Sequence, residues 1–205
     1  MTTDSPVLWY LNRGTGIVLL SLLSLSVLLG VLALTGRPAG DGGSRVPRFV
    51  TQNLHRNLAL GSVLLLVAHI VTAVADEFVD IRWWQAVVPF GATYAPLWLE
   101  LGTLAFDLML VVAVTSLLRH RIGLRSWRIV HLTSWAAYAA AVAHGFGIGT
   151  DLRHRDHWEM WSIVPTAFSV TVVVVAFAWR LAGGLRARED VVRPSAERAR
   201  IGVEA

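Results

Sequence analysis

Residues 52–75 read QNLHRNLALGSVLLLVAHIVTAVA, a run that carries a single formal charge, on Arg56. Its length suits an α-helix that crosses the bilayer core, which is about 30 Å thick and needs about 20 residues. The run also contains His55 and His69. An unpaired polar group in hydrocarbon costs roughly several kcal/mol. The stretch therefore predicts a membrane helix in which two histidines, His55 and His69, each need a binding partner.

A second run, residues 126–147, repeats this arrangement with His131 and His144. One further apolar run separates the two, so the histidine-bearing spans run parallel in either orientation of the protein. His55 and His131 then lie toward one side of the membrane, and the later histidine of each run lies toward the other. Imidazole is a strong ligand for haem iron, so the pattern indicates two stacked haems, each held by two histidines.

The spacing within each pair constrains the helices. The step from His55 to His69 turns an α-helix by about 1400°, within about 40° of whole turns, and rises about 21 Å. The step from His131 to His144 is one residue shorter and leaves the two rings about 140° apart on a straight helix. The helix over residues 126–147 is therefore expected to bend or overwind. The residues that offer places to do so are Thr133, Ser134, Gly145 and Gly147.

Composition places the chain among integral membrane proteins, because 55% of its 205 residues are hydrophobic, more than a soluble domain of this size can bury. We expect an all-α bundle of five transmembrane helices in the cell membrane. The five apolar runs are residues 14–36, 52–75, 97–118, 126–147 and 160–182. The transmembrane domain is expected over residues 1–183, and a disordered cytoplasmic tail over 184–205, which mixes Arg, Glu, Pro and Ser.

The basic residues, all of them arginine, predict the orientation. They are concentrated in the loop after the first run, in the turn between the third and fourth runs and in the tail, and form no single patch that would suit nucleic acid. The positive-inside rule then places the N-terminus outside and the C-terminus in the cytoplasm. Residues 76–96 are expected to form an interfacial segment over the outer end of the bundle. Their aromatic and proline residues include Trp83, Trp84, Pro89, Tyr94 and Pro96.

Two absences limit the chemistry. The chain has no cysteine, which excludes iron–sulfur clusters, thiolate ligation and disulfides, so any redox centre must be held by histidine. It also has no glycine-rich dinucleotide fingerprint. Electrons are therefore expected from a separate flavoprotein, from free reduced flavin or from a membrane quinol.

The histidine pattern resembles the haem-binding membrane domain of ferric reductases, NADPH oxidases and the haem subunit of the bacterial periplasmic methionine sulfoxide reductase. The resemblance covers most of residues 9–180, with local likeness in Leu54-His55-Arg56-Asn57 and Trp127-Arg128-Ile129-Val130-His131. It implies two b-type haems and electron transfer across the membrane. The axial ligands it implies are His55, His69, His131 and His144. Family members commonly have six spans and often a cytoplasmic flavin and nicotinamide domain, neither of which is expected here.

Charged residues near the ligands are candidates for supporting roles. Arg56 and Arg128 flank the inner ligands, and Arg13 lies at the outer mouth of the first run, so each is a candidate partner for anionic haem propionates. The alternatives are positive-inside charge and, for Arg13, a snorkelling position. Asp107, at the middle of the third run, is a candidate for a proton relay, with a polar packing contact to a neighbouring helix as the alternative.

Two other groups of residues are candidates for functional roles. Trp135 and Tyr138 lie between the two ligand levels and are candidates to pack between the haems. The outward loop with His154 and His157 would bind a metal ion weakly or guide a ferric chelate, or it is simply hydrophilic. Its acidic residues are Asp151, Asp156 and Glu159.

These features favour a di-haem b-type cytochrome, an oxidoreductase component that passes electrons from a cytoplasmic-side donor to an extracytoplasmic acceptor. By resemblance the acceptor is a ferric chelate, oxygen or a partner reductase. One alternative is a quinol-fed haem subunit of an exported reductase. Another is a non-redox transport or proton-conducting bundle in which the histidines and Asp107 form a relay. The plainest alternative is four core histidines bonded to hydroxyls or backbone carbonyls.

Overall fold

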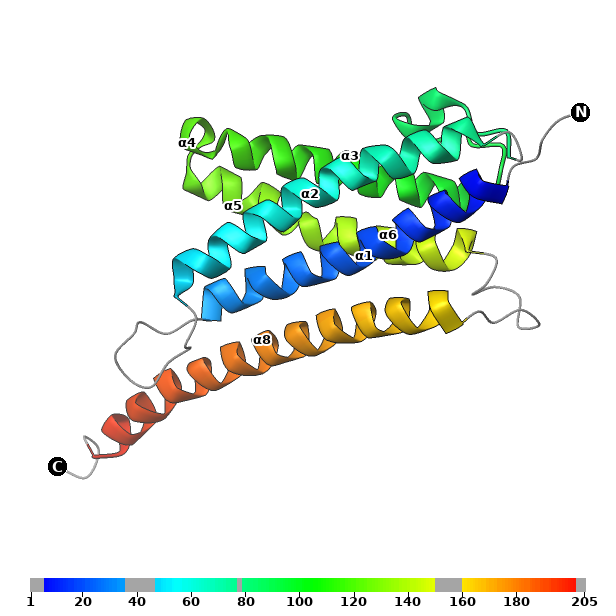
Figure 1. Ribbon diagram of the computed structural model, residues 1–205. Helices are drawn as coiled ribbons and strands as arrows, with labels where there is room; N and C mark the ends of the chain where they lie inside the picture. The colour runs from blue at the N-terminus through cyan, green and yellow to red at the C-terminus, as the bar shows by residue number, and fades with distance from the viewer. Residues whose placement is uncertain (1–5, 36–46, 77–78, 150–159, 202–205) are drawn as a thin grey trace, which may run out of the picture.

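The computed structural model of the chain describes residues 6–35, 47–76, 79–149 and 160–201. Its helices are α1 (Pro6–Thr35), α2 (Arg48–Ala75), the short 3-10 helix η1 (Trp83–Ala86), α3 (Pro96–Leu117), α4 (Arg119–Ile122), α5 (Leu124–Leu132), α6 (Ser134–Ile148) and α8 (Met160–Ile201) (Figure 1). The described residues contain no strand, so the all-α prediction is confirmed.

Four helices among the described residues are long and apolar enough to cross a membrane: α1, α2, α3 and the part of α8 up to Gly183. The chain is a multi-pass integral membrane protein. The fourth predicted span, residues 126–147, is instead divided between α5 and α6 at Thr133. Each of these two helices is too short to cross alone, so the predicted count of five spans is matched by only four continuous membrane-length helices.

The break at Thr133 is the irregularity that the spacing between His131 and His144 required. The Thr133 backbone N–H and its Oγ1 both donate to Val130 O, at 3.0 and 2.7 Å. A hydroxyl that bonds back to the preceding turn competes with the regular helical ladder and bends the helix. Gly147 was also expected to permit a bend. In the structure it allows the Trp98 indole to pack against α6, since a Cβ at this position would overlap the ring.

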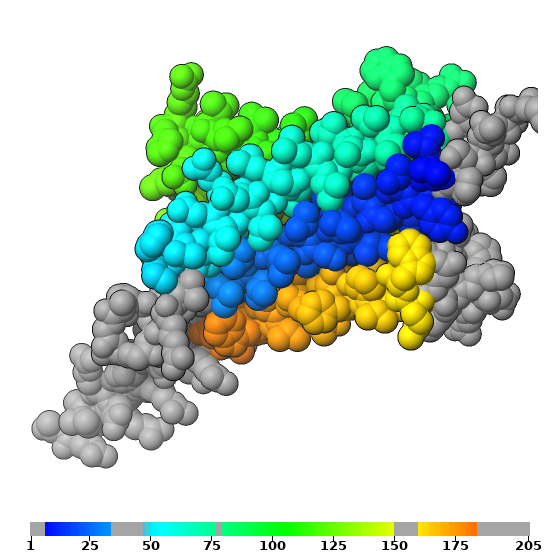
Figure 2. Space-filling model, viewed as in Figure 1, coloured from blue at the N-terminus to red at the C-terminus, as the bar shows by residue number. Residues whose placement is uncertain are grey.

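The helices form two closely packed pairs. α1 packs along α2, and α3 packs along α6, whereas α2 meets α3, and α1 meets α6, only sparsely. α8 packs on α1, so that α1 lies between α2 and α8 (Figure 2). The predicted ligands divide between the pairs, with His55 and His69 on α2, His131 on α5 and His144 on α6. Any group bound by one histidine from each pair would lie in the seam between them.

A buried hydroxyl cluster ties α1, α6 and α8 together. Tyr138 Oη lies 2.8 Å from Ser24 Oγ and donates to Ser169 O at 3.4 Å. Trp135, one turn away, packs against Phe177 of α8 with ring centroids 5.0 Å apart. Both rings expected between the ligand levels therefore contact neighbouring helices instead, Tyr138 on α1 and α8 and Trp135 on α8, and they help to hold α8 onto the bundle.

The predicted interfacial segment is anchored to α3 at one end of the bundle. Gln85 of η1 is buried and donates to Gly91 O at 3.0 Å, and Thr103 of α3 donates to Gln85 O at 2.7 Å. Trp83 and Phe90 are 74% and 81% exposed, which suits side chains that meet a membrane interface. The described residues before α3, 79–95, form no membrane-length helix.

The C-terminal segment differs from its prediction. α8 continues to Ile201, so residues 184–201 are helical where the composition predicted a disordered tail. The segment is rich in Ala, Arg and Glu, which are strong helix formers, and it extends a helix that is already nucleated, so Pro194 does not end it. Residues 202–205 lie outside the described part of the chain, and a domain boundary at residue 183 stays a prediction.

The hydroxyl cluster gives a stability prediction. Tyr138→Phe should lower the free energy of unfolding by about 0.5–1 kcal/mol, the usual size of an interhelical hydrogen bond in a membrane protein. Tyr10→Phe, at a ring that is 56% exposed, is the matched control and should change nothing. Thermal unfolding in detergent measures both, and equal midpoints for the two variants would contradict the structural role of the cluster.

Candidate functional site

Three of the four histidines are held in the same way. In each, Nδ1 lies within hydrogen-bond distance of a backbone carbonyl on the helix packed beside it. The contacts are His55 to Ser26 O at 2.7 Å, His69 to Asn12 O at 3.0 Å and His144 to Trp98 O at 2.8 Å. A carbonyl only accepts hydrogen bonds, so this geometry assigns the proton to Nδ1 and leaves the lone pair on Nε2. This is the tautomer that binds a metal through Nε2.

A glycine lies four residues after each accepting carbonyl. The sets are Asn12 with Gly16, Ser26 with Gly30, and Trp98 with Gly102. A Cβ on these glycines would lie 3.1 Å from His69 Cε1, 3.4 Å from His55 Cε1 and 2.6 Å from His144 Cε1. Residues four apart are neighbours on one helical face, so each glycine removes the side chain that would keep the imidazole away from the carbonyl.

The fourth histidine, His131, is held by its neighbours' rings. Trp127 stacks on it at a centroid distance of 4.9 Å, and the His55 ring lies 6.2 Å away at an interplanar angle of 74°. Within the described part of the chain, His131 Nδ1 is a buried side-chain nitrogen that has no hydrogen-bond partner. Such atoms are rare in native proteins. The orphaned nitrogen fits a residue whose position a bound group sets, rather than a core histidine satisfied by the protein alone.

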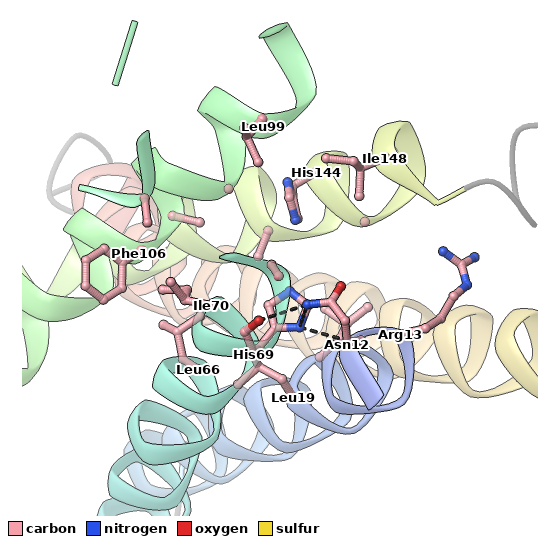
Figure 3. A pocket seen from close by; sticks show the side chains of 18 of the residues that line it. Asn12, Arg13, Leu19, Leu66, His69, Ile70, Leu99, Phe106, His144 and Ile148 are labelled. Carbon is pink, nitrogen blue, oxygen red and sulfur yellow. Dashed lines mark hydrogen bonds between the residues drawn. The ribbon is translucent and has the colours of Figure 1, made fainter. Parts of the chain in front are cut away.

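His69 and His144 line a cavity of about 290 Å³ (Figure 3). Residues of α1, α2, α3, α6, the start of α8 and the interfacial segment form its walls, which are mostly apolar. Figure 3 shows the two imidazoles reaching the cavity from different helices, with Asn12 beside His69. The Asn12 side chain also donates from Nδ2 to His69 O at 2.8 Å, so Asn12 contacts the ligand helix through its side chain and the imidazole through its backbone carbonyl.

The donor set fits haem better than a bare metal ion. No three His, Cys, Asp or Glu side chains gather among the residues that the structure describes. The histidines occur instead as two pairs, one with its rings 6.2 Å apart and the other lining a common cavity. Two imidazoles suit the axial positions of an iron whose remaining donors come from a porphyrin.

The predicted supporting arginines are placed differently from one another. Arg13 lines the cavity, with its guanidinium carbon 5.8 Å from the Trp9 ring centroid. Arg56 and Arg128 are exposed beside the histidine pair at the α4 end of the bundle. Arg13 thus lines the same cavity as His69 and His144, while Arg56 and Arg128 lie at the surface near His55 and His131.

Of the remaining candidates, Asp107 lies apart from the histidines. Asp107 does not line the cavity and has no hydrogen-bond or ion-pair partner among the described residues, so these residues form no relay between it and the imidazoles. The loop with His154 and His157 lies outside the described residues, together with its acidic side chains Asp151, Asp156 and Glu159.

Residues 15–143, more than half of the chain, match the family described as ferric reductase like transmembrane component. The chain therefore belongs to the ferric reductase-like transmembrane family and is a membrane electron-transfer component. The match includes His55, His69 and His131 and ends one residue before His144. Domains of this family generally bind haem. No curated protein and no solved structure matches the chain.

Sequence reasoning found the four histidines but missed the groups that orient them. The acceptors are backbone carbonyls, which every residue has, so no side-chain pattern marks them. The available signal was the isolated glycines within apolar helices, since a glycine there usually marks a close approach. Gly16, Gly30 and Gly102 are such positions.

The glycine contacts give a second prediction. Gly102→Ala places a Cβ 2.6 Å from His144 Cε1 and should destabilise the protein by about 1–3 kcal/mol through overpacking. Gly61→Ala, in α2 with nothing near its Cβ position, should be neutral or stabilising by up to about 1 kcal/mol. Thermal unfolding in detergent compares them, and equal behaviour would show that Gly102 does not position His144.

Proposed function

We propose that the chain is a di-haem b-type cytochrome that carries electrons across the membrane, from a cytoplasmic-side donor to an extracytoplasmic acceptor. The observation that carries this proposal is the arrangement of four imidazoles as two pairs, with three of the rings fixed so that Nε2 is free to bind. His55 and His131 would hold one haem, and His69 and His144 the other. A bound haem supplies an iron that gains and loses one electron.

The chain's own residues account for orientation and for the exclusion of water. The carbonyls of Ser26, Asn12 and Trp98 keep the ligand tautomers, and hydrogen bonds of this kind raise the basicity of the imidazole. Apolar walls limit access of water to the outer pair. Arg13 is our candidate for a propionate at the outer site, and Arg56 and Arg128 are those for the inner site.

Two histidines would hold each haem, His55 with His131 and His69 with His144, and ligation by two imidazoles favours electron transfer to an acceptor that does not bind the iron. The acceptor would approach the outer pair at the end covered by the interfacial segment, because Asp76, Val79 and Tyr94 line the same cavity as His69 and His144. We infer a ferric chelate, oxygen or a partner reductase as the acceptor class.

The donor is inferred to be a separate component: a flavoprotein, free reduced flavin or a membrane quinol. The described residues form membrane-length helices, shorter helices and their connections, and contain no separate folded unit that would hold a flavin. A separate redox partner is also what membership of this family favours. With a quinol donor, the chain would be the haem subunit of an exported reductase.

The orientation is part of the proposal. α1 begins at the end of the bundle where η1 lies, and α8 finishes beyond the opposite end (Figure 1). We propose that α5 and α6 together form a fifth crossing, which gives five spans with the N-terminus outside and the C-terminus in the cytoplasm. The arginines of the α4 and α5 region then lie in the cytoplasm, as the positive-inside rule favours.

Haem content tests the pairing of the ligands. Each single histidine-to-alanine variant should lose about half of the haem absorbance, because each haem needs two axial ligands. Combining His55→Ala with His131→Ala should cost no more than either change alone, since both remove one site. Combining His55→Ala with His144→Ala should abolish the signal.

The control for this series is His120→Ala, at an exposed residue of α4 that should keep full haem content. The measurement is a reduced-minus-oxidised spectrum with haem quantitation per chain. A colourless wild-type protein after expression with ample haem would overturn the proposal. Equal loss in the two double variants would overturn the pairing alone.

Site-directed labelling tests the orientation, because the chain lacks cysteine. Val88→Cys, at the η1 end, should react with a membrane-impermeant maleimide on intact cells. Leu124→Cys, at the α4 end, should react only after the membrane is permeabilised. Both positions are exposed, at 52% and 64%, so accessibility to reagent is matched. The reverse labelling pattern would contradict the proposed topology.

A further inference from the structure

His131 lacks the contact that orients the other three histidines. His55, His69 and His144 each place Nδ1 against a backbone carbonyl of a neighbouring helix. A hydrogen bond of this kind fixes the rotation of an imidazole whose other nitrogen binds a metal. Within the described part of the chain, Nδ1 of His131 is buried and has no hydrogen-bond partner. The rotation of this ring must therefore be set by another contact.

That contact is the indole of Trp127, which lies four residues earlier in α5. Residues four apart lie on the same face of a helix. The two rings are stacked, with their centroids 4.9 Å apart and an interplanar angle of 28°. The planes of His131 and His55, in contrast, meet at 74°. The imidazole of His131 is thus close to parallel with the indole and steeply inclined to the ring of its partner histidine.

The indole is itself held by α3. Trp127 is half-buried, and its Nε1 donates to Ser116 Oγ at 3.2 Å. An indole has only this one polar group, which usually finds a partner when it is buried. Ser116 is the next to last residue of α3, so the bond ties α5 to the end of that helix. It fixes the indole within its own plane, which stacking on a second ring does not do.

The turn between α3 and α5 brings these side chains together. Gly123 has φ 79° and ψ 151°, a conformation that is essentially confined to glycine. α5 begins directly after it, and the Trp127 backbone N–H donates to Gly123 O at 3.1 Å. Trp127 and His131 therefore lie on a short helix that is joined to α3 through the turn at Gly123 and the bond to Ser116.

We propose that Ser116 and Trp127 are positioning residues that set the plane of the His131 imidazole at the inner haem, the one between His55 and His131. They replace the backbone carbonyl used at the other three ligands. The inference rests on the proposed di-haem function and deepens it. A hydrogen bond from Nδ1 makes Nε2 more basic, whereas a stacked indole orients the ring and leaves Nδ1 unbonded.

The orientation of the ring has a spectroscopic signature. In low-spin ferric haem, the angle between the two axial imidazole planes controls the splitting of the iron d orbitals. Planes that are close to perpendicular give a large maximal g value in the EPR spectrum, and parallel planes give a smaller one. The 74° angle between His55 and His131 therefore predicts a large maximal g value for the inner haem while Trp127 holds the ring.

EPR spectroscopy of the oxidised protein tests the proposal in a parent that combines His69→Ala with His144→Ala, so that only the inner haem is bound. Trp127→Leu should lower the maximal g value and broaden its line, because the imidazole is no longer held at one angle. Trp127→Phe keeps a stacked ring without the N–H, and Ser116→Ala removes the acceptor, so both should give an intermediate spectrum.

Two further variants serve as controls. Ser116→Thr keeps the hydroxyl and should retain the spectrum of the parent. Trp83→Leu makes the same change as Trp127→Leu at a ring that is 74% exposed in the interfacial segment, and it should leave the spectrum unchanged. Haem content is measured on every sample, so a shift in g value is separated from loss of haem.

The outcomes are separable. A spectrum that Trp127→Leu leaves unchanged would overturn the proposal, as would identical spectra for Ser116→Ala and Ser116→Thr. If Trp127→Leu loses its haem, the two Ser116 variants decide. If the parent fails to accumulate, the same changes are read in the wild-type background, where one of two haem signals should move. Wild-type protein without haem would overturn the proposed function as well, whereas two bound haems with insensitive spectra would overturn the positioning role alone.

Discussion

The hydrogen bond from an imidazole to the backbone carbonyl of the neighbouring helix is the interaction on which this structure depends. An imidazole in hydrocarbon is costly unless both of its nitrogens are used. Helix carbonyls are already bonded within their own helix, yet each retains a second lone pair. At three carbonyls a glycine four residues further along the helix leaves that lone pair accessible. Each of these carbonyls accepts a hydrogen bond from one histidine. These contacts join α1 to α2 and α3 to α6, which are the two closely packed helix pairs.

This arrangement makes the two proposed haem sites unequal. At the cavity, His69 and His144 are both held by carbonyls, whereas at the other level only His55 is so held and His131 is stacked on Trp127. A hydrogen bond from the far nitrogen of a ligand makes the near nitrogen more basic, and ligand basicity tunes a metal. The difference between the levels is therefore built into the protein before any cofactor is considered.

Other polar side chains inside the bundle form hydrogen bonds within the chain itself. Ser24 and Ser62 donate to the carbonyls of Leu20 and Leu58 one turn earlier, so they add small side chains to helix contacts without an unsatisfied hydroxyl. Ser24 and Ser169 also meet Tyr138. These hydrogen bonds join α1, α6 and α8 and leave the inward hydroxyls satisfied.

Sequence alone determined the membrane class, the helical content, the two levels of histidines and the need for an irregularity between His131 and His144. These follow from run length, composition and helical geometry, which are local properties. Tertiary structure decided which carbonyls hold three of the histidines and that the irregularity lies at Thr133. It also decided that Asp107 does not line the cavity and that Trp135 and Tyr138 contact α8 and α1. The spans are apolar all round, so their sequence carries little information about which face turns inward. Only packing against a particular neighbour settles the rotation of each helix, and with it the direction of every polar side chain.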